Sequence, residues 1–404
     1  MSNSERVFGT VSRGVRAPII KEGDNIAQIV VDTILNASEK SGVPVKDKDI
    51  IAITESVVGR AQGNYATVEQ IAEDIRNKFP EGHAAIVYPI LSRNRFSVCL
   101  KGIASGLKKL VVLFSYPSDE VGNHLVSLEQ VEEVGLNPNW DVLTEKEYRS
   151  FFGHQKHQFT GVDYVDFYRK TIEECGCECE IYFSNNPCDV LDYEENNILV
   201  CDIHTRQHTK KVILEDTPEA RVFDLTEVLS SSVNGSGYNA EYGLLGSNKA
   251  TEDKVKLFPR LDTSIEVVFD IFKGILGKTG KSVEVLIYGD GAFKDPVGKI
   301  WELADPVVGV AYTEGLVGTP NELKLKYLAD NDFSALSGDE LKNAISDKIK
   351  EKQSNLVGKM ISEGTTPRQY SDLVGSLCDL TSGSGDKGTP IVWIQGYFDN
   401  YTTD

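Results

Sequence analysis

The sequence lacks any apolar run of the roughly 18–20 residues that a membrane-spanning helix needs. Residues 1–14 are polar and contain no hydrophobic segment of the kind found in signal peptides. Basic residues are in deficit, because 42 Lys+Arg stand against 61 Asp+Glu and leave a net charge of −19. This charge repels phosphate backbones and anionic lipid, so we expect binding to neither nucleic acid nor membrane. We expect a cytoplasmic protein whose seven cysteines, an odd number, are reduced thiols and not a closed disulfide framework.

Hydrophobic residues make up 40% of the 404 residues, which is enough for a sizeable core. At about 150 residues per domain, this length indicates two or three units. We divide the chain into an N-terminal α/β segment at 1–126, a second segment at 127–206, a long loop and helix at 207–280, and a C-terminal segment at 281–404. The last segment contains a charged helical insert at 310–365.

Helical and strand patterns alternate along most of the chain. Thr67 and Gln70 form a capping-box pattern ahead of apolar residues at helical spacing, which predicts a helix start. The expected helices lie at 24–40, from 67 onward, and at 94–107, 162–174, 263–276 and 367–378. The expected strands lie at 49–58, 84–90, 110–116, 179–184, 197–202, 283–288 and 391–395, whereas 229–250 is a long loop rich in Ser, Gly and Asn. This alternation predicts an α/β or α+β fold with a mixed sheet core and flanking helices.

Two glycine-rich segments resemble nucleotide-binding motifs. Five residues separate Gly274 from Gly280, where a P-loop has four, and a strand pattern follows, so we interpret this segment as a helix C-cap and turn. The second segment, Gly383-Ser384-Gly385-Asp386-Lys387-Gly388, is a literal G-x-G-x-x-G, but it precedes a strand and does not open a helix. Its glycines permit several N–H groups to turn toward one anion, although the pattern alone favours an ordinary loop.

Acidic residues follow two of the expected strands. Asp119 comes after the strand at 110–116, and Asp202 ends the strand at 197–202. Ligands gather at the carboxyl ends of strands in open sheets, and two carboxylates there could share a divalent cation that carries phosphates. The alternative is that each aspartate builds a turn, and the residues alone leave the two interpretations near even.

Other polar residues give weaker signals. Cys175, Cys177 and Cys179 lack the usual zinc-knuckle spacing, so we favour structural packing over a metal site. His154 and His157 lie in a polar region and are expected at the surface. Asp290 and Asp295 follow the strand at 283–288 and either supply further carboxylates or build a turn.

Four motifs, in order along almost the whole chain, resemble those of coenzyme F420-0:L-glutamate ligases, the GTP-dependent γ-glutamyl ligases of deazaflavin biosynthesis. The first is Gly14-Val-Arg-Ala17-Pro18-Ile19-Ile20-Lys-Glu-Gly23-Asp24, and the second is Ile53-Thr-Glu55-Ser-Val-Val-Gly-Arg60-Ala-Gln-Gly63. The third, Asp202-Ile-His-Thr-Arg206, is similar to the family's Asp-Thr-His-Gly-Arg, and the fourth is the 383–390 glycine segment with its following strand.

The resemblance implies an enzyme that joins an amino acid, plausibly L-glutamate, to a carboxylate acceptor. GTP activates the carboxylate as an acyl phosphate, and the amine then displaces phosphate to form an amide. The resemblance also implies Mg²⁺ or Mn²⁺ on the nucleotide phosphates, assistance by a monovalent cation such as K⁺, and a homodimer with the site near the dimer contact. The alternative is a nucleotide- or metabolite-binding homologue with a regulatory role and no turnover.

The resemblance assigns roles to individual residues. Asp119 and Asp202 hold metal and serve catalysis, and Glu120 is an alternative aligned acid. Arg60 takes the place of a phosphate-facing lysine, and Asn123 contacts the nucleotide. The nucleotide is also lined by Ala17, Pro18, Ile19 and Ile20, and its phosphates are cradled by Gly383, Ser384, Gly385, Asp386, Lys387 and Gly388. Ile203 and Ser384 differ from the family's threonine and glutamine, which motivates the non-catalytic alternative.

Overall fold

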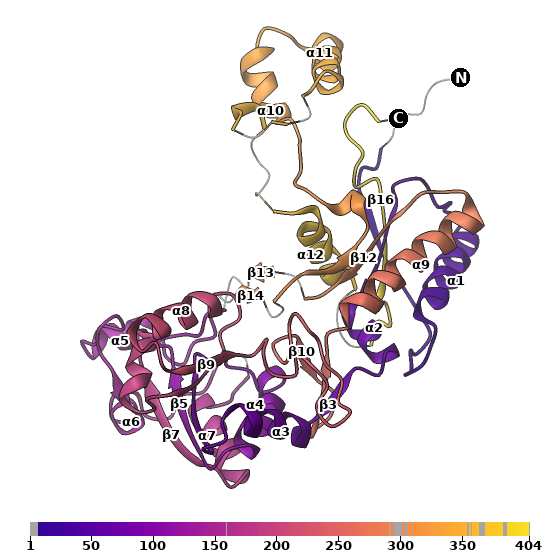
Figure 1. Cartoon of the computed structure of the whole chain (residues 1–404). Coiled ribbons are helices and arrows are strands. Elements are labelled where there is room, and N and C mark those ends of the chain that lie inside the picture. The colour runs from indigo at the N-terminus through magenta and orange to yellow at the C-terminus, as the bar shows by residue number, and fades with distance from the viewer. Residues whose placement is uncertain are drawn as a thin grey trace.

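The computed structural model shows two lobes with a small helical arm between and above them (Figure 1). It describes residues 7–158, 160–290, 292–294, 301–303, 306–353, 355–356, 358–362, 368–382 and 386–403. Among these residues, no helix has the length and apolar character needed to cross a bilayer.

The first lobe is built on a five-stranded mixed sheet. Its strands, in spatial order, are β1 (Val11–Val15), β16 (Ile391–Gln395), β2 (Ile50–Thr54), β12 (Glu284–Tyr288) and β15 (Gly309–Tyr312). Strands β2 and β12 are parallel neighbours although about 230 residues separate them in sequence. Helices α1 (Ile26–Ser41) and α9 (Leu261–Thr279) pack on one face, and α12 (Tyr370–Ser382) packs on the other.

The second lobe is a six-stranded sheet that is parallel except at one edge. Its strands, in spatial order, are β6 (Leu143–Thr144), β7 (Glu178–Phe183), β5 (Lys109–Phe114), β4 (His83–Val87), β8 (Asn197–Val200) and β9 (Arg221–Asp224). One face carries α3 (Val68–Lys78), α4 (Arg95–Ser105) and α7 (Tyr164–Glu174), and the other carries α8 (Arg206–Asp216) and the 3₁₀ helix Pro187–Asp192. From β4 the chain adds strands first on one side and then on the other, so the strand order reverses between β4 and β8.

Smaller elements complete the fold. A three-stranded sheet of β3 (Tyr65–Thr67), β11 (Lys254–Leu257) and β10 (Ser247–Lys249) lies beside α2 (Glu55–Ala61) where the lobes meet. Helices α5 (Leu128–Glu133) and α6 (Glu145–Phe152) belong to the second lobe. The arm consists of α10 (Leu325–Tyr327), a π turn at Leu328–Asp332 and α11 (Gly338–Lys350), with a core of its own. The remaining elements are the hairpin of β13 (Ala292–Lys294) and β14 (Trp301–Leu303) and the 3₁₀ turns Glu314–Leu316 and Met360–Ser362.

The mixed sheet core with flanking helices that the sequence predicts is confirmed. The P-loop-like segment is indeed a helix end, because α9 stops at Thr279 and Gly280 takes the left-handed conformation at φ 70°. The strand predicted at 49–58 is partly wrong: it ends at Thr54, whose side chain accepts a hydrogen bond from Ser56 N and caps α2.

The cysteine and histidine predictions have mixed outcomes. Cys177 and Cys179 are buried in the core and Cys175 packs against it, so the packing interpretation is confirmed. His154 is exposed, but His157 is buried, so the surface prediction for that residue is wrong.

Candidate functional site

The carboxyl ends of β4 and β8 lie side by side where the strand order reverses. Open parallel sheets bind ligands in the crevice at such a point, because the chains leave neighbouring strands in opposite directions there. The loop after β5 and the loop after β8, which carry the acidic residues predicted from sequence, both reach this crevice.

Asp119 is buried, and protein donors occupy both of its oxygens. Oδ1 accepts the backbone N–H groups of Val121 at 3.1 Å and Asn123 at 2.8 Å. Oδ2 accepts Leu91 N at 2.8 Å and Asn123 Nδ2 at 2.8 Å. Burial raises the pKa of Asp119, while these hydrogen bonds oppose that rise. A carboxylate offers about four lone-pair sites, so Asp119 fastens the β5 loop to the β4 loop with its acceptor capacity filled.

Glu120 reaches the start of α8. Its carboxylate accepts the backbone N–H of Ile203 at 2.6 Å, of His204 at 2.9 and 3.1 Å, and of Thr205 at 2.8 Å. Three successive N–H groups at a helix N-terminus form a natural anion site, and here a side chain of the same molecule fills it.

Asp202 is 1% exposed and only half satisfied. Its Oδ2 accepts Thr205 Oγ1 at 2.6 Å and Thr209 Oγ1 at 3.0 Å, whereas its Oδ1 is buried with no hydrogen-bond partner. Burial raises the pKa of Asp202, and the negative charge of Glu120 raises it further. A buried carboxylate oxygen without a donor is rare, and beside a second carboxylate it suits a hard divalent cation.

Arg206 supplies positive charge beside these acids. Its Nη1 donates to Ile203 O, and its Nε is buried with no acceptor. Our sequence reasoning gave this residue no role, although it closes the Asp202–Arg206 motif and so carried a usable signal.

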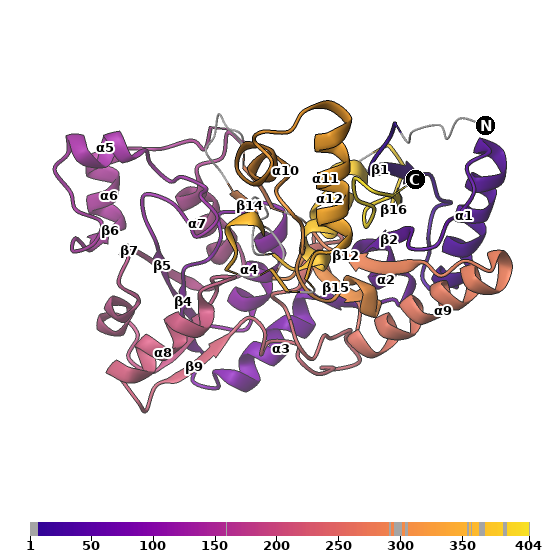
Figure 2. The ribbon, with the colours of Figure 1, turned by 90° about the horizontal axis from the view of Figure 1, so that it is seen from above.

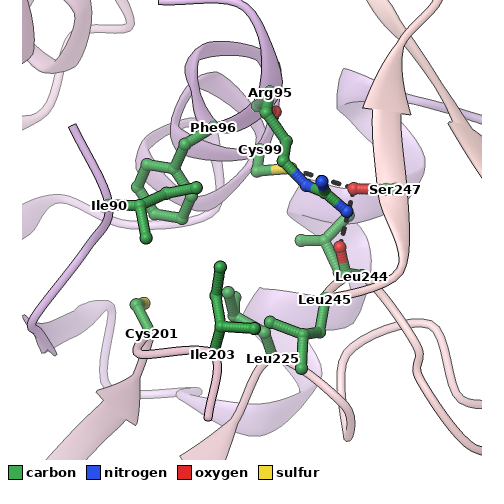
Figure 3. A pocket seen from close by; sticks show the side chains of 10 residues that line it. All are labelled: Ile90, Arg95, Phe96, Cys99, Cys201, Ile203, Leu225, Leu244, Leu245 and Ser247. Carbon is green, nitrogen blue, oxygen red and sulfur yellow. Dashed lines mark hydrogen bonds between the residues drawn. The ribbon is translucent and has the colours of Figure 1, made fainter. Parts of the chain in front are cut away.

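A small apolar pocket adjoins the Asp202 loop (Figure 3). Ser247 closes one side, where its Oγ donates to Leu244 O at 2.6 Å. The lining residues are Ile90, Arg95, Phe96, Cys99, Cys201, Ile203, Leu225, Leu244, Leu245 and Ser247.

A second group of candidates gathers in the first lobe, at the edge where β1, β2 and β12 end. Ala17 N donates to Gly388 O at 3.1 Å, and Thr54 N donates to Pro390 O at 3.0 Å. Ile20 is buried and Ile19 is exposed, and Arg60 is exposed on α2. Asp386, Lys387 and Gly388 are exposed, whereas Gly383, Ser384 and Gly385 lie outside the described residues, as does Asp295.

One ion pair connects the first lobe to the second. Arg95 at the start of α4 lies 3.9 Å from Asp290, which follows β12. Within the described part of the chain, however, no hydrogen bond or ion pair joins the Ala17–Gly388 group to Asp119, Glu120 or Asp202. The structure therefore joins the acidic loops to one another, and the roles of the two groups in a shared site stay predictions.

A surface cluster of His154, Asp163 and Asp166 also has metal-ligand geometry. Arg149 donates to both carboxylates, at 2.7 Å to Asp163 and 2.5 Å to Asp166. The guanidinium group pairs with both acids, so we interpret the cluster as a surface salt-bridge network.

The sequence pattern of the F420-0:gamma-glutamyl ligase family matches residues 14–396, from within β1 to the residue after β16. The chain belongs to this family. The match spans both lobes and confirms the resemblance drawn from the four motifs, and it supports a gamma-glutamyl ligase type of function. No curated protein matches the sequence.

Proposed function

We propose that this F420-0:gamma-glutamyl ligase family member uses GTP to join L-glutamate to a carboxylate acceptor. The observation that carries the proposal is the buried, unpartnered Oδ1 of Asp202 beside Glu120 at the point where the strand order reverses. A ligase that handles a triphosphate needs charge neutralisation more than covalent chemistry, and this arrangement offers it.

Asp202 and Glu120 are the residues that would hold Mg²⁺ or Mn²⁺, with K⁺ as a candidate second ion. The fit rests mainly on Asp202, whose Oδ1 lacks a partner. Glu120 is exposed beside it and would exchange backbone N–H contacts for the cation, whereas Asp119 is buried with both oxygens occupied. We therefore give Asp119 and Asn123 a positioning role. A bound divalent cation would neutralise phosphate charge.

The chain's cations and backbone would bind the remaining charges. Arg206 follows the Asp202 loop and has a buried Nε without an acceptor, so it is suited to a phosphate or carboxylate oxygen. In the first lobe, Ala17 to Ile20, Arg60 and the segment ending at Gly388 would contact the nucleotide. The ion pair between Arg95 and Asp290 joins the two lobes, which supports a site that both lobes share.

The reaction proceeds in two transfers. The acceptor carboxylate attacks the γ-phosphorus of GTP, GDP leaves, and an acyl phosphate forms. The amine of glutamate then attacks the acyl carbon, phosphate leaves, the amine loses a proton, and an amide bond results. We place this chemistry in the cytoplasm, in keeping with seven free thiols.

Thermal unfolding with GTP, GDP and ATP, each with and without Mn²⁺, tests the binding. A nucleotide at 100 times its dissociation constant stabilises the folded state by about 2.7 kcal/mol. We expect the largest rise with GTP and Mn²⁺, its loss in Asp202→Asn, and its retention in Asp192→Asn, a change at an exposed aspartate of the same lobe. An unchanged response in Asp202→Asn would refute the assignment of Asp202.

Turnover is tested with a panel of carboxylate acceptors and hydroxylamine, which traps an acyl phosphate as a hydroxamate. The alternative, a regulatory homologue without turnover, draws support from Ile203. This side chain is buried in the apolar pocket and offers no hydroxyl group to a cation. Stabilisation by Mn²⁺ and GTP without hydroxamate or phosphate release across the panel favours that alternative.

A further inference from the structure

Three backbone N–H groups just ahead of α8, which lies beside β9 in the second lobe (Figure 2), bind a side chain of the same molecule. Residues 203–205 donate to the Glu120 carboxylate over distances from 2.6 to 3.1 Å. Successive N–H groups at the start of a helix bind phosphate and carboxylate groups, because the helix dipole adds to their partial positive charge. The Glu120 carboxylate therefore lies where the anionic group of a ligand would fit.

The Asp202 carboxyl group is held against the first turn of α8 and has an oxygen to spare. Its Oδ2 accepts Thr205 Oγ1 and Thr209 Oγ1, which fixes the group at that turn. Its Oδ1 has no hydrogen-bond partner among the described residues, although Asp202 is 1% exposed. The charge of Glu120 raises the pKa of Asp202, so the two carboxyl groups lie close together. A buried oxygen without a partner, beside an occupied anion site, indicates that a ligand completes this region.

Glu120 can leave the N–H groups without a change in the loop that carries it. Its side chain is exposed, and the backbone of the loop is fixed by Asp119, which accepts the N–H groups of Val121 and Asn123. Rotation about the side-chain bonds of Glu120 thus moves the carboxylate alone. A carboxylate has one charge on two oxygens, whereas a phosphate monoester has a charge of about −1.5 to −2 on three oxygens at neutral pH. Phosphate is therefore the stronger ligand for three N–H groups.

Arg206 adds positive charge beside the same N–H groups. Its Nη1 donates to the carbonyl oxygen of Ile203, the first of the three residues, and its Nε is buried with no acceptor in the described part of the chain. A guanidinium group next to backbone N–H groups favours a phosphate ligand over a neutral one.

We propose that the N–H groups of residues 203–205 form a phosphate-binding site, which Glu120 covers in the free protein. When a divalent cation binds Asp202, the Glu120 carboxylate turns to that cation, and the uncovered N–H groups bind a phosphate group of the nucleotide. Phosphate binding thus depends on the cation, and the free protein holds metal-free nucleotide poorly. The identity of the cation and of the nucleotide rests on the proposed function, whereas the covered site rests on the contacts of Glu120.

The first test measures the affinity of the metal-free protein for inorganic phosphate by NMR titration in EDTA, followed at the amides of residues 203–205. Glu120→Ala uncovers these N–H groups, so we expect it to bind phosphate at least about 10-fold more tightly than the unchanged protein does. Glu129→Ala removes an exposed negative charge from α5 of the same lobe, and this matched control should leave the affinity unchanged. A folded Glu120→Ala variant that binds phosphate no better than the control would overturn the covered site.

The second test needs no substitution and follows amide hydrogen exchange at residues 203–205 in the unchanged protein. Mg²⁺ alone should make this exchange at least about 10-fold faster, because Glu120 turns away, and GTP added with Mg²⁺ should slow it again. The amides of Val121 and Asn123, which Asp119 holds, serve as internal controls and should not change.

Exchange at residues 203–205 that stays slow at every Mg²⁺ concentration would overturn the release of Glu120 by the cation. The phosphate titration uses neither metal nor nucleotide, so its result stands whether or not the chain proves to be a GTP-dependent ligase. Failure of the covered site is thereby separable from failure of the proposed function.

Discussion

Glu120 Oε2 lies 2.6 Å from the backbone nitrogen of Ile203, so the loop after β5 is fastened to the loop after β8 across the strand β4 between them. This contact brings the Glu120 charge close enough to Asp202 to raise the pKa of that buried carboxyl group. Two acids with different roles thus follow one another in the sequence: Asp119 faces inward and builds the loop, and Glu120 reaches across the crevice.

Glu120→Gln should lower both the free energy of unfolding and the binding of nucleotide, and the two effects can be measured separately. An amide has one acceptor oxygen and no charge, so it holds the three N–H groups of residues 203–205, just ahead of α8, less well, and we expect a loss of about 1 kcal/mol in the free energy of unfolding. We also expect the Mn²⁺-dependent stabilisation by GTP to disappear. Urea unfolding and nucleotide melts measure the two effects, and a full-sized response to Mn²⁺ and GTP would remove Glu120 from the cation site.

Asp119→Asn should lower the free energy of unfolding more than Glu120→Gln does and should keep the response to Mn²⁺ and GTP. The new amide nitrogen faces donors that the carboxylate oxygen accepted, so we expect a loss of about 2–4 kcal/mol in the free energy of unfolding. The conservative control, Asp192→Asn, should stay within about 0.5 kcal/mol. If Asp119→Asn unfolded normally in urea but no longer responded to Mn²⁺ and GTP, then Asp119 itself would be a metal ligand.

Asp49 gives a pH dependence independent of the site. Its Oδ2 accepts Trp393 Nε1 at 2.9 Å and Gln395 Nε2 at 2.8 Å, and burial raises its pKa above the ordinary 3.8. The folded state therefore takes up the proton at a higher pH than the unfolded chain does. As pH falls toward 3.8, the unchanged protein should gain stability relative to Asp49→Asn, and the difference should level off below that value. Urea unfolding at several pH values measures it, and a constant difference would contradict the raised pKa.

Two glycines in helices should respond oppositely to alanine. A Cβ on Gly102 of α4 would lie 2.5 Å from Ile71 Cγ2 of α3, so Gly102→Ala should cost about 1–3 kcal/mol through overpacking. A Cβ on Gly277 of α9 meets nothing within 4 Å, and Gly277→Ala should stabilise by up to about 1 kcal/mol through helix propensity. Urea unfolding compares them, and equal effects would contradict the close packing of α3 on α4.

Local chemistry explains which elements could be predicted from sequence. Thr67 and Gln70 make the expected capping box at the start of α3, and the apolar run at 391–395 is a buried strand with the predicted bounds. The strand at 49–58 was overextended because Glu55-Ser-Val-Val is apolar enough for a strand. Only the cap at Thr54 shows that a helix starts there.

The candidate site could be predicted only in part, because its decisive contacts join segments far apart in sequence. Asp119 and Asp202 were found from their places after strands, but one of the four donors to Asp119 is Leu91 N, which no local pattern connects to it. Glu120 was assigned by alignment, whereas its contact with residues 203–205 depends on the strand order. Arg206 stood in a recognised motif, yet the burial of its Nε is visible only in the fold.

The second lobe enters and leaves the first through neighbouring stretches of chain. Leu257 N donates to Asn64 O at 2.9 Å, Asn64 Nδ2 donates to Phe258 O at 2.7 Å, and Arg260 N donates to Gln62 Oε1 at 3.0 Å. The roughly 190 residues between these stretches thus form an inserted lobe whose two ends are hydrogen-bonded to each other. A rotation of one lobe relative to the other would therefore hinge at these paired connections. The ion pair between Arg95 and Asp290 would break or form in such a rotation.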